Sequence, residues 1–213
     1  QLGSGLVFPI AEEDILCDPI DIPTHWPRLC GIDFGWDHPT AVVWITWDRD
    51  TDIVYIYDCY AMRQETVPVH ASAINGRGKW IPVVWPMDGR QADKGSGKSL
   101  TEQYRKEGVN MLRDHFSNPS SNGMKEGSGG NSVEAGIMEI LTRMQTKRLK
   151  IFRNQSKLLE ELRMYHRKDG KIVPAHDDVI SAMRYCVMSL RKARIKNYQP
   201  MQFKTDSEFN VFK

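Results

Sequence analysis

The order of hydrophobic patterns along the chain predicts an α/β fold in which helices flank one mixed sheet. Three segments rich in Val, Ile, Trp and Tyr follow one another in the N-terminal half, as in a meander of strands. Apolar segments of strand length then alternate with segments of helical periodicity. Aspartates stand at the ends of two expected strands and at the start of the last expected helix. This combination indicates a fold that assembles an acidic site.

Length and composition are those of a globular protein with one large domain. The 213 residues suffice to bury a core without disulfides, and 40% hydrophobic and 26% charged residues are ordinary proportions. No apolar run approaches the roughly 18–20 residues that cross a bilayer, and we find no basic-then-apolar leader. The four cysteines form no CxxC pair, which argues against a zinc site and suits a reducing cytoplasm. We therefore expect a cytoplasmic protein that is neither secreted nor inserted in a membrane.

The first regular structure is expected at residue 28. Residues 1–27 carry four prolines and no sustained period, which is typical of an extended arm or linker. Residues 28–35, 41–48 and 53–60 are the three meander strands. Residues 80–85 are nearly all apolar, as in a central parallel strand, and form the fourth strand.

Helices and strands alternate in the rest of the chain. The expected helices cover residues 65–74, 99–106, 156–167 and 177–192, with a further helix capped by Ser132, and the expected strands cover residues 109–116 and 149–152, with a small hairpin around 169–173. Residues 117–131 are expected to form a loop, and residues 198–213 a flexible tail. The order β-β-β-α-β-α-β-α is that of a ribonuclease H-like fold, here expected over residues 28–197.

Two aspartates follow strands that the predicted topology makes neighbours. Asp33 lies at the end of the first strand in Gly-Ile-Asp-Phe-Gly, and Asp88 lies just past the fourth in Met-Asp-Gly-Arg. Each aspartate alone is equally well explained as a turn residue. Because the first and fourth strands are adjacent in this topology, we expect the two carboxylates to lie side by side at one edge of the sheet.

Asp177 and Asp178 open the last expected helix. Either residue could serve as an N-cap and stabilise the helix dipole without any further role. Two adjacent aspartates are more than a cap needs, and on a helical wheel both flank the apolar face, with Asp178 closer to its centre. We therefore expect Asp178 to be a metal ligand and Asp177 to be a second ligand or the cap.

Carboxylates that converge from two strand ends and a helix start are suited to hard divalent cations. Oxygen-only ligands favour two Mg²⁺ or Mn²⁺ ions, about 3.5–4 Å apart in two-metal sites. Such a pair activates a water and stabilises the leaving 3′ oxygen of a phosphodiester. The predicted activity is metal-dependent hydrolysis by Asp33, Asp88, Asp178 and Asp177. Asp37 could assist from outside the ligand set, although a turn residue is the simpler interpretation.

Basic residues are concentrated in one part of the chain. Residues 143–171 contain ten Lys or Arg and three acids, whereas the net charge of the whole chain is only +2. A solvated helix face explains this equally well, but beside an acidic site it favours contact with a polyanion. The candidate DNA-binding residues are Arg90, Lys94, Lys98, Arg143, Lys147, Arg153, Lys157 and Arg167.

The segment Gly97-Lys98-Ser99 resembles the end of a phosphate-binding P-loop. The full pattern needs a glycine five residues before Gly97, and that position is Ala92. We therefore expect a flexible loop whose Lys94 and Lys98 touch DNA phosphates, and no ATP site in this chain.

The sequence resembles the nuclease domain of the large terminase subunit of tailed bacteriophages, particularly headful-packaging phages of the P22 type. The resemblance covers roughly residues 28–192. It rests on residues 31–41 and 87–89, the helix at 132–143, residues 161–165 and, most specifically, Asp-Asp-Val-Ile-Ser-Ala-Met-Arg-Tyr at 177–185. One departure is that many relatives carry a further Asp where this chain has Ser181, which leaves only Asp177 and Asp178 on that helix.

This resemblance implies an endonuclease that cuts concatemeric double-stranded viral DNA during genome packaging, in the cytoplasm of the infected bacterial host. It also implies an N-terminal ATPase domain elsewhere in the full-length protein, and a portal protein and a small terminase subunit as partners. Two alternatives stay open. One is another ribonuclease H-like nuclease, such as a junction resolvase or recombinase, and the other is a non-catalytic DNA- or portal-docking module. A phosphotransferase built on Gly97-Lys98-Ser99 is a third, weaker alternative.

Overall fold

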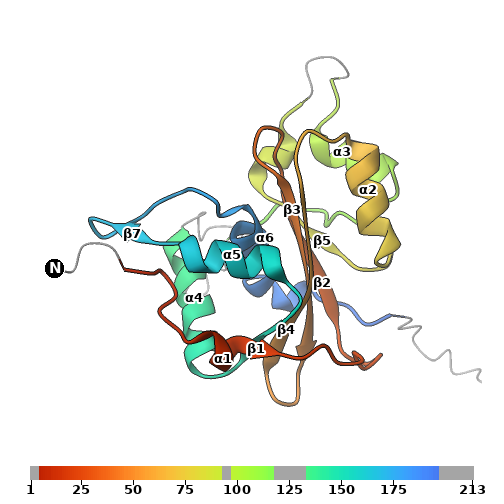
Figure 1. Ribbon diagram of the computed structural model, residues 1–213. Coiled ribbons are helices and arrows are strands. Elements are labelled where there is room, and N and C mark those ends of the chain that lie inside the picture. The colour runs from red at the N-terminus through yellow and green to blue at the C-terminus, as the bar shows by residue number, and fades with distance from the viewer. Residues whose placement is uncertain (1–4, 93–96, 118–132, 197–213) are drawn as a thin grey trace, which may run out of the picture.

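A computed structural model describes residues 5–92, 97–117 and 133–196 of the chain (Figure 1). The strands are β1 (Leu16–Cys17), β2 (Arg28–Asp33), β3 (Thr40–Asp48), β4 (Ile53–Met62), β5 (Val83–Val84), β6 (Leu149–Phe152), β7 (Arg167–Lys168) and β8 (Lys171–Ile172). The helices are α1 (Glu12–Ile15), α2 (Val67–Gly76), α3 (Leu100–Lys106), α4 (Val133–Gln145), α5 (Ser156–Met164) and α6 (Asp178–Val187), with 3₁₀ turns η1 (Met87–Arg90) and η2 (Leu190–Lys192).

Six strands form one mixed sheet in the order β1-β6-β4-β3-β2-β5. β2, β3 and β4 pair antiparallel as the predicted meander, whereas β5 joins β2, and β6 joins β4 and β1, in parallel. The expected adjacency of the first and fourth strands is thus confirmed. β7 and β8 form a separate two-stranded hairpin, also as expected.

β3 is the central strand, and its composition explains that position. Eight of the nine residues from Thr40 to Asp48 are buried. β-branched and aromatic residues predominate in this run, and they suit a strand that is covered on both faces. Trp44 and Ile45 flank a β-bulge against β4, which increases the local twist of the sheet.

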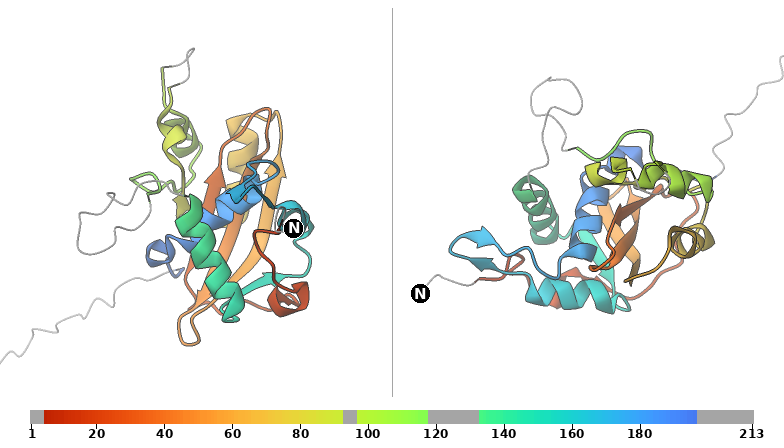
Figure 2. Two further views of the ribbon diagram at one scale, coloured as in Figure 1. Left: turned by 90° about the vertical axis from the view of Figure 1, so that its left-hand side faces the viewer. Right: turned by 90° about the horizontal axis from the view of Figure 1, so that it is seen from above.

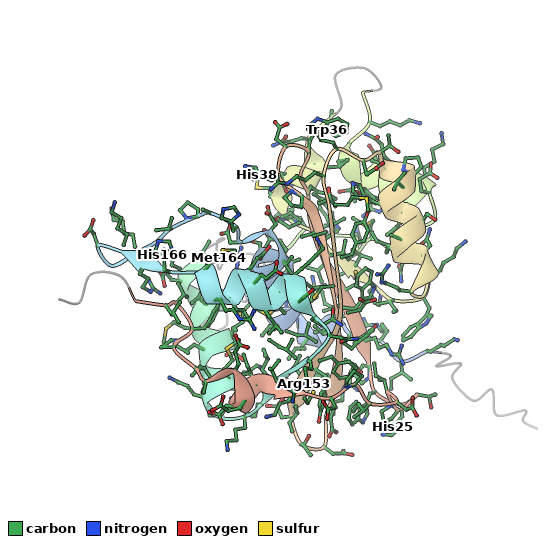
Figure 3. All side chains as sticks on the ribbon, in the orientation of Figure 1. His25, Trp36, His38, Arg153, Met164 and His166 are labelled. Carbon is green, nitrogen blue, oxygen red and sulfur yellow. The ribbon has the colours of Figure 1, made fainter. Side chains whose placement is uncertain are left out.

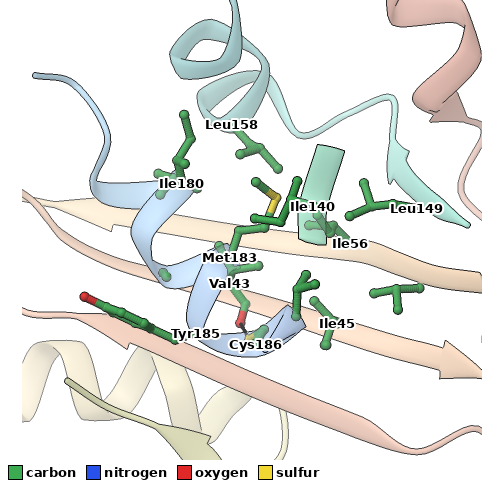
Figure 4. Packing of buried hydrophobic residues seen from close by; sticks show 14 of the residues in the cluster. Val43, Ile45, Ile56, Ile140, Leu149, Leu158, Ile180, Met183, Tyr185 and Cys186 are labelled. Atoms are coloured by element: carbon green, nitrogen blue, oxygen red, sulfur yellow. Dashed lines mark hydrogen bonds between the residues drawn. The ribbon is translucent and has the colours of Figure 1, made fainter. Parts of the chain in front are cut away.

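Helices cover both faces of the sheet, and each face has its own apolar core (Figure 2). One core packs α4, α5 and α6 on the sheet; Figure 4 shows Met183 and Cys186 of α6 beside Val43 and Ile45 of β3. The other core packs the α2 and α3 side, with Trp44 and Tyr104 fully buried. None of the helices in the described part of the chain is long and apolar enough to cross a membrane.

Close contact between α6 and β2 depends on a glycine. A Cβ atom added to Gly31 would fall on the carbonyl oxygen of Ala182 and within 2.8 Å of the sulfur of Cys186. Only a residue without a side chain lets the helix backbone approach the strand this closely. The sequence Cys-Gly-Ile-Asp therefore sets the depth at which α6 lies against the strand that ends in Asp33.

Two expectations about the elements were wrong. Residues 5–27 are not an extended arm, because α1 packs on the domain, β1 pairs with β6, and Ile15 is buried in the core. Residues 109–116 do not form a strand; Met111 makes a single parallel bridge to Val83. There the backbone nitrogen of Val83 donates to the carbonyl oxygen of Asn110, and that of Leu112 donates to the carbonyl oxygen of Val83, so the pairing with β5 is confined to one bridge. The indole nitrogen of Trp85 also donates to the carbonyl oxygen of Leu112.

Most other boundaries agree with the prediction within a few residues. The helix expected over residues 156–167 ends at Met164, and the one expected over 177–192 is α6 followed by η2. The expected cap at Ser132, the tail at residues 198–213 and nearly all of the loop at 117–131 lie outside the described residues.

Candidate active site

Asp33 and Asp88 reach the same end of the sheet. Asp33 is the last residue of β2, and Asp88 lies in η1, directly after the neighbouring parallel strand β5. The parallel register places Gly31 beside Val84, so both chains pass this edge in the same direction. This is the arrangement that the predicted topology required.

Gly89 holds η1 tightly against the end of β2. A Cβ atom at Gly89 would lie 2.6 Å from the hydroxyl of Thr101 and 2.8 Å from the ring of Phe34. Thr101 also donates a hydrogen bond of 2.8 Å to the carbonyl oxygen of Gly89. The Asp-Gly dipeptide is therefore a packing requirement, which brings Asp88 next to the residue that follows Asp33.

The third contribution comes from the start of α6. Asp177 is the N-cap residue and Asp178 is the first helical residue, but the side chain of Asp177 makes no capping hydrogen bond. The cap is Glu161 of α5, whose carboxylate accepts hydrogen bonds from the backbone nitrogens of Val179 (3.2 Å) and Ile180 (2.9 Å). Asp177 and Asp178 are thus not used as caps and can act as ligands.

Glu161→Ala is expected to lower the free energy of unfolding by about 1–2 kcal/mol, because two helix N–H groups lose a charged acceptor. It should also reduce nuclease activity, since the position of Asp177 and Asp178 depends on that helix end. Thermal unfolding and DNA cleavage measure the two effects. Glu160→Ala, at the exposed neighbouring position of α5, is the matched control. Equal behaviour of the two variants would contradict the capping role.

The four aspartates interact electrostatically across this end of the sheet. Burial raises the pKa of Asp33 to about 7, and the charge of Asp88 adds to the rise, with smaller contributions from Asp178 and Asp177. Burial also raises the pKa of Asp88, Asp177 and Asp178. These carboxylates oppose one another's ionisation, so a cation bound among them would be strongly favoured.

Tyr185 links α6 to Asp33. Its hydroxyl donates a hydrogen bond of 3.2 Å to Oδ1 of Asp33, which partly offsets the rise in the pKa of that carboxyl group. Tyr185 lies seven residues after Asp178 and therefore on the same side of the helix. The seven-residue spacing in the sequence could have indicated that Tyr185 lies near the acidic residues, but only charged residues were predicted as ligands.

Basic side chains other than the predicted ones surround the aspartates. Burial raises the pKa of Asp178, and the nearby charges of His38, Arg63 and His176 oppose that rise. His38 lies in the loop after β2 at the site end of the sheet (Figure 3). In Asp37-His38-Pro39 the sequence pattern indicated only the aspartate as a site residue, not His38. Arg63 directly follows β4, and no sequence motif indicates a role for it.

The donor set fits divalent cations, although it is not preassembled. Among the residues that the structure describes, no three His, Cys, Asp or Glu side chains are gathered closely enough to form a ready-made metal site. Within the same described ranges, none of the four aspartates forms an ion pair with a basic side chain. Oxygen donors of this kind suit hard ions.

Two of the predicted DNA-binding residues lie at the opposite end of the sheet. Arg143 is only 7% exposed and donates to Glu139 (2.9 Å) and to Asp52 in the β3–β4 turn. Lys147 is exposed but follows α4 at the same remote end, where β6 begins beside Val54. Arg143 is therefore a structural residue, and it offers no surface for DNA.

The other predicted DNA-binding residues are dispersed. Arg153 pairs with Asp18 and lies near His25, far from Trp36 and His38 (Figure 3). Arg167 binds both carboxylate oxygens of Glu134 at 2.8 and 2.7 Å. Arg90, Lys98, Arg153 and Lys157 are exposed, whereas Lys94 lies outside the described residues. Of these residues, only Arg90 is placed in the same element as one of the aspartates, η1.

Sequence comparisons identify relatives over most of the chain. A family model described as the terminase RNaseH-like domain matches residues 30–190. The large terminase subunit of Salmonella phage P22 is 40% identical over 195 residues, which cover 91% of this chain and 38% of that protein. The large terminase subunit of Enterobacteria phage LP7 is 40% identical over 188 residues, 88% of this chain and 38% of that protein. The chain thus spans well under half the length of these curated relatives.

Solved structures show the same fold. The P22 large terminase nuclease domain aligns with a TM-score of 0.80 and 40% identity over 92% of this chain and 97% of that chain. The nuclease of thermophilic phage G20c with bound cobalt aligns with a TM-score of 0.55 and 18% identity over 89% and 98%. The nuclease domain of phage SPP1 with bound Mn aligns with a TM-score of 0.53 and 12% identity over 83% and 96%. The predicted ribonuclease H-like fold is confirmed.

Proposed function

Because the chain belongs to the terminase ribonuclease H-like family, we propose that it is a divalent-metal-dependent endonuclease that hydrolyses phosphodiester bonds of double-stranded DNA. The observation that carries the proposal is the convergence of Asp33, Asp88, Asp177 and Asp178 from β2, η1 and α6 on one end of the sheet. Carboxylates that raise one another's pKa, and that form no ion pair with a basic side chain in the described part of the chain, indicate a cation site.

Asp33, Asp88 and Asp178 would hold the ions, and Asp177 would serve as a further ligand. Two Mg²⁺ or Mn²⁺ ions, when bound, supply the activation of water and the stabilisation of the leaving oxygen in phosphodiester hydrolysis. Related nuclease domains bind divalent ions, since the G20c nuclease holds cobalt and the SPP1 nuclease domain holds Mn. Because these two proteins share only 18% and 12% identity with this chain, the comparison supports only a common fold. The identity and number of the ions bound by this chain are therefore part of the proposal.

The remaining polar residues would orient the ligands and attract the substrate. Tyr185 fixes one oxygen of Asp33, and Glu161 fixes the helix end that carries Asp177 and Asp178. Arg63 places positive charge beside this acidic cluster, and the imidazole of His38 lies near Asp178, where a DNA phosphate would approach. The predicted stretch 143–171 contributes less to this face, because Arg143 is buried at the other end of the sheet.

The role in the virus follows from the family and is proposed at the level of the full-length protein. The curated relatives are large terminase subunits, of which this chain spans 38%. We propose that the chain cuts concatemeric viral DNA during genome packaging, in the host cytoplasm. It would do so together with an ATPase domain of the same protein, a portal protein and a small terminase subunit.

Digestion of supercoiled plasmid tests the metal-dependent activity. Cleavage is expected with Mg²⁺ or Mn²⁺ and is expected to be lost in EDTA. Asp88→Ala and Asp178→Ala should each lower the rate by about a hundredfold or more, because each removes a carboxylate from the ion site. Asp21→Ala, at an exposed aspartate of the N-terminal segment, is the control that should keep full activity. Cleavage that persists in EDTA, or in both site variants, would exclude this mechanism.

A further inference from the structure

A cavity lies directly beside Asp88, on the α2 and α3 side of the sheet. It has a volume of about 550 Å³, within the range of small-ligand sites, and Asp88 forms part of its wall. Asp88 is therefore shared between the cavity wall and the proposed cation site. None of the roles assigned above to the aspartates, Glu161 or Tyr185 uses this space.

Aromatic side chains form much of the cavity wall. The rings of Phe34 and Tyr104 lie 5.5 Å apart between their centroids, and Tyr104 is almost fully buried. Trp36 also lines the cavity, but it is 58% exposed and is the most exposed of the large hydrophobic residues that the structure describes. Such a large aromatic surface at the mouth of a cavity is unusual unless it contacts a partner.

Polar groups accompany the aromatic walls. His70 is 2% exposed, and its Nδ1 lies 2.9 Å from the hydroxyl of Tyr60, which fixes the ring. Burial lowers the pKa of His70, and the charge of Glu65 and a hydrogen bond to its backbone oppose that shift, so the imidazole is held in place as part of the wall. Gln91 and Gln103 contribute amide groups to the same lining. Aromatic surfaces with a few amide and imidazole groups are the combination that recognises a nucleobase.

The rim that carries Trp36 is held in place. The hydroxyl of Thr40 accepts from the backbone nitrogen of Gly35 (3.2 Å) and donates to its carbonyl oxygen (2.9 Å). The carbonyl oxygen of Trp36 accepts from the backbone nitrogen of Gln64 at 3.2 Å. A Cβ atom at Gly35 would fall on the carbonyl oxygen of His38, so the loop is closed around that glycine. These contacts fix the side of the cavity that Gly35 and Trp36 form.

We propose that this cavity accommodates one unpaired nucleobase of the DNA strand whose phosphate lies at Asp88. The proposal rests on the proposed nuclease function, because it is the phosphate at the cation site that would bring a base to the cavity mouth. A base flipped out of a duplex enters such a site when stacking on the protein replaces stacking in the helix. Trp36 would supply the outer stacking face, and Phe34 and Tyr104 the inner wall.

Binding measurements on an inactivated protein test the inference separately from cleavage. The probe is a short duplex with one extrahelical base, compared with the same duplex carrying an abasic residue at that position. The protein inactivated by exchange of Mg²⁺ for Ca²⁺, with all four aspartates intact, should bind the extrahelical base about tenfold more tightly, as a single base–aromatic stack predicts. Trp36→Ala under the same conditions should abolish the difference, and Trp36→Phe should retain most of it. Met138→Ala, at a 54% exposed residue of α4, is the matched control.

The outcomes separate this inference from the nuclease proposal. Equal affinity for the base and the abasic residue, or a difference that persists in Trp36→Ala, would overturn the cavity assignment while leaving metal-dependent cleavage untouched. Conversely, the absence of divalent-ion-dependent cleavage by the unmodified chain would remove the nuclease proposal. The base preference could still be measured in that case, because it requires no turnover.

Discussion

Asp33→Asn is expected to reduce plasmid cleavage by about a thousandfold or more while leaving the fold intact. Asn keeps the shape of the side chain but removes the charge that would attract the divalent ions. A loss of several kcal/mol of transition-state stabilisation corresponds to this factor. Asp33 is the most central of the four aspartates, since its pKa responds to all three others. The rate of supercoil loss in Mg²⁺ or Mn²⁺ measures the effect.

The same substitution should raise thermal stability in EDTA. The folded-state pKa of Asp33, about 7, lies above the ordinary aspartate value of 3.8. A raised carboxyl pKa means that ionisation opposes folding, and this penalty grows between the two pKa values as pH rises. The increase in melting temperature should therefore be larger at pH 8 than at pH 5.

Asp50→Asn is the control for both effects. Asp50 is an exposed aspartate in the β3–β4 turn, at the end of the sheet remote from Asp33. It should change neither cleavage nor the pH dependence of stability. An Asp33→Asn protein that cleaves at the normal rate would remove the proposed cation site, and one that is less stable at pH 8 would show that the charge is compensated.

Gly31→Ala is expected to give the largest loss of stability of any single methyl group added to the sheet. The new Cβ atom would fall on the carbonyl oxygen of Ala182, which belongs to the helix backbone and cannot turn away. Overpacking of this kind costs about 3 kcal/mol, which corresponds to a drop of roughly 6–12 °C in melting temperature for a domain of this size. Cleavage should also fall, because α6 carries Asp177 and Asp178.

Gly76→Ala is the matched control for this change. Gly76 is the last residue of α2, and a Cβ atom placed there meets nothing within 4 Å. Because alanine is the better helix former, this variant should be as stable as the parent or slightly more stable. Similar melting temperatures for the two alanine variants would mean that α6 does not pack on β2 as described.

Much of the fold could be predicted because strand and helix periods are local properties of the chain. The run from Thr40 to Asp48 reads as a buried strand by composition alone, and β3 is that strand. The strand expected at residues 109–116 does not form, because this segment pairs with β5 only around Met111, and the extent of that tertiary contact is not set by the local pattern. The prediction of an extended arm at residues 5–27 was wrong for a similar reason, because the pairing of β1 with β6 joins segments that are far apart in the sequence.

The candidate site also combines features that the sequence predicted with features that only the tertiary structure determined. Asp33, Asp88, Asp177 and Asp178 were identified from their places at strand ends and at a helix start, and the strand order implied that Asp33 and Asp88 would lie at one edge of the sheet. Aspartate is common in turns and at helix starts, so only the predicted strand order, together with two adjacent aspartates at one helix start, indicated a shared site. The structure places all four at one end of the sheet.

Only the tertiary structure decided which neighbours these aspartates have. Glu161, rather than Asp177, caps α6. The hydroxyl of Tyr185 on α6 donates a hydrogen bond to Asp33 at the end of β2. Arg143, which the charge pattern predicted to bind DNA, instead forms ion pairs with Glu139 and Asp52 at the far end of the sheet. The physical reason is that a period along the chain determines which face a residue is on. Which residues lie opposite that face depends on how closely two elements pack. Here the distance between the backbones of α6 and β2 depends on Gly31.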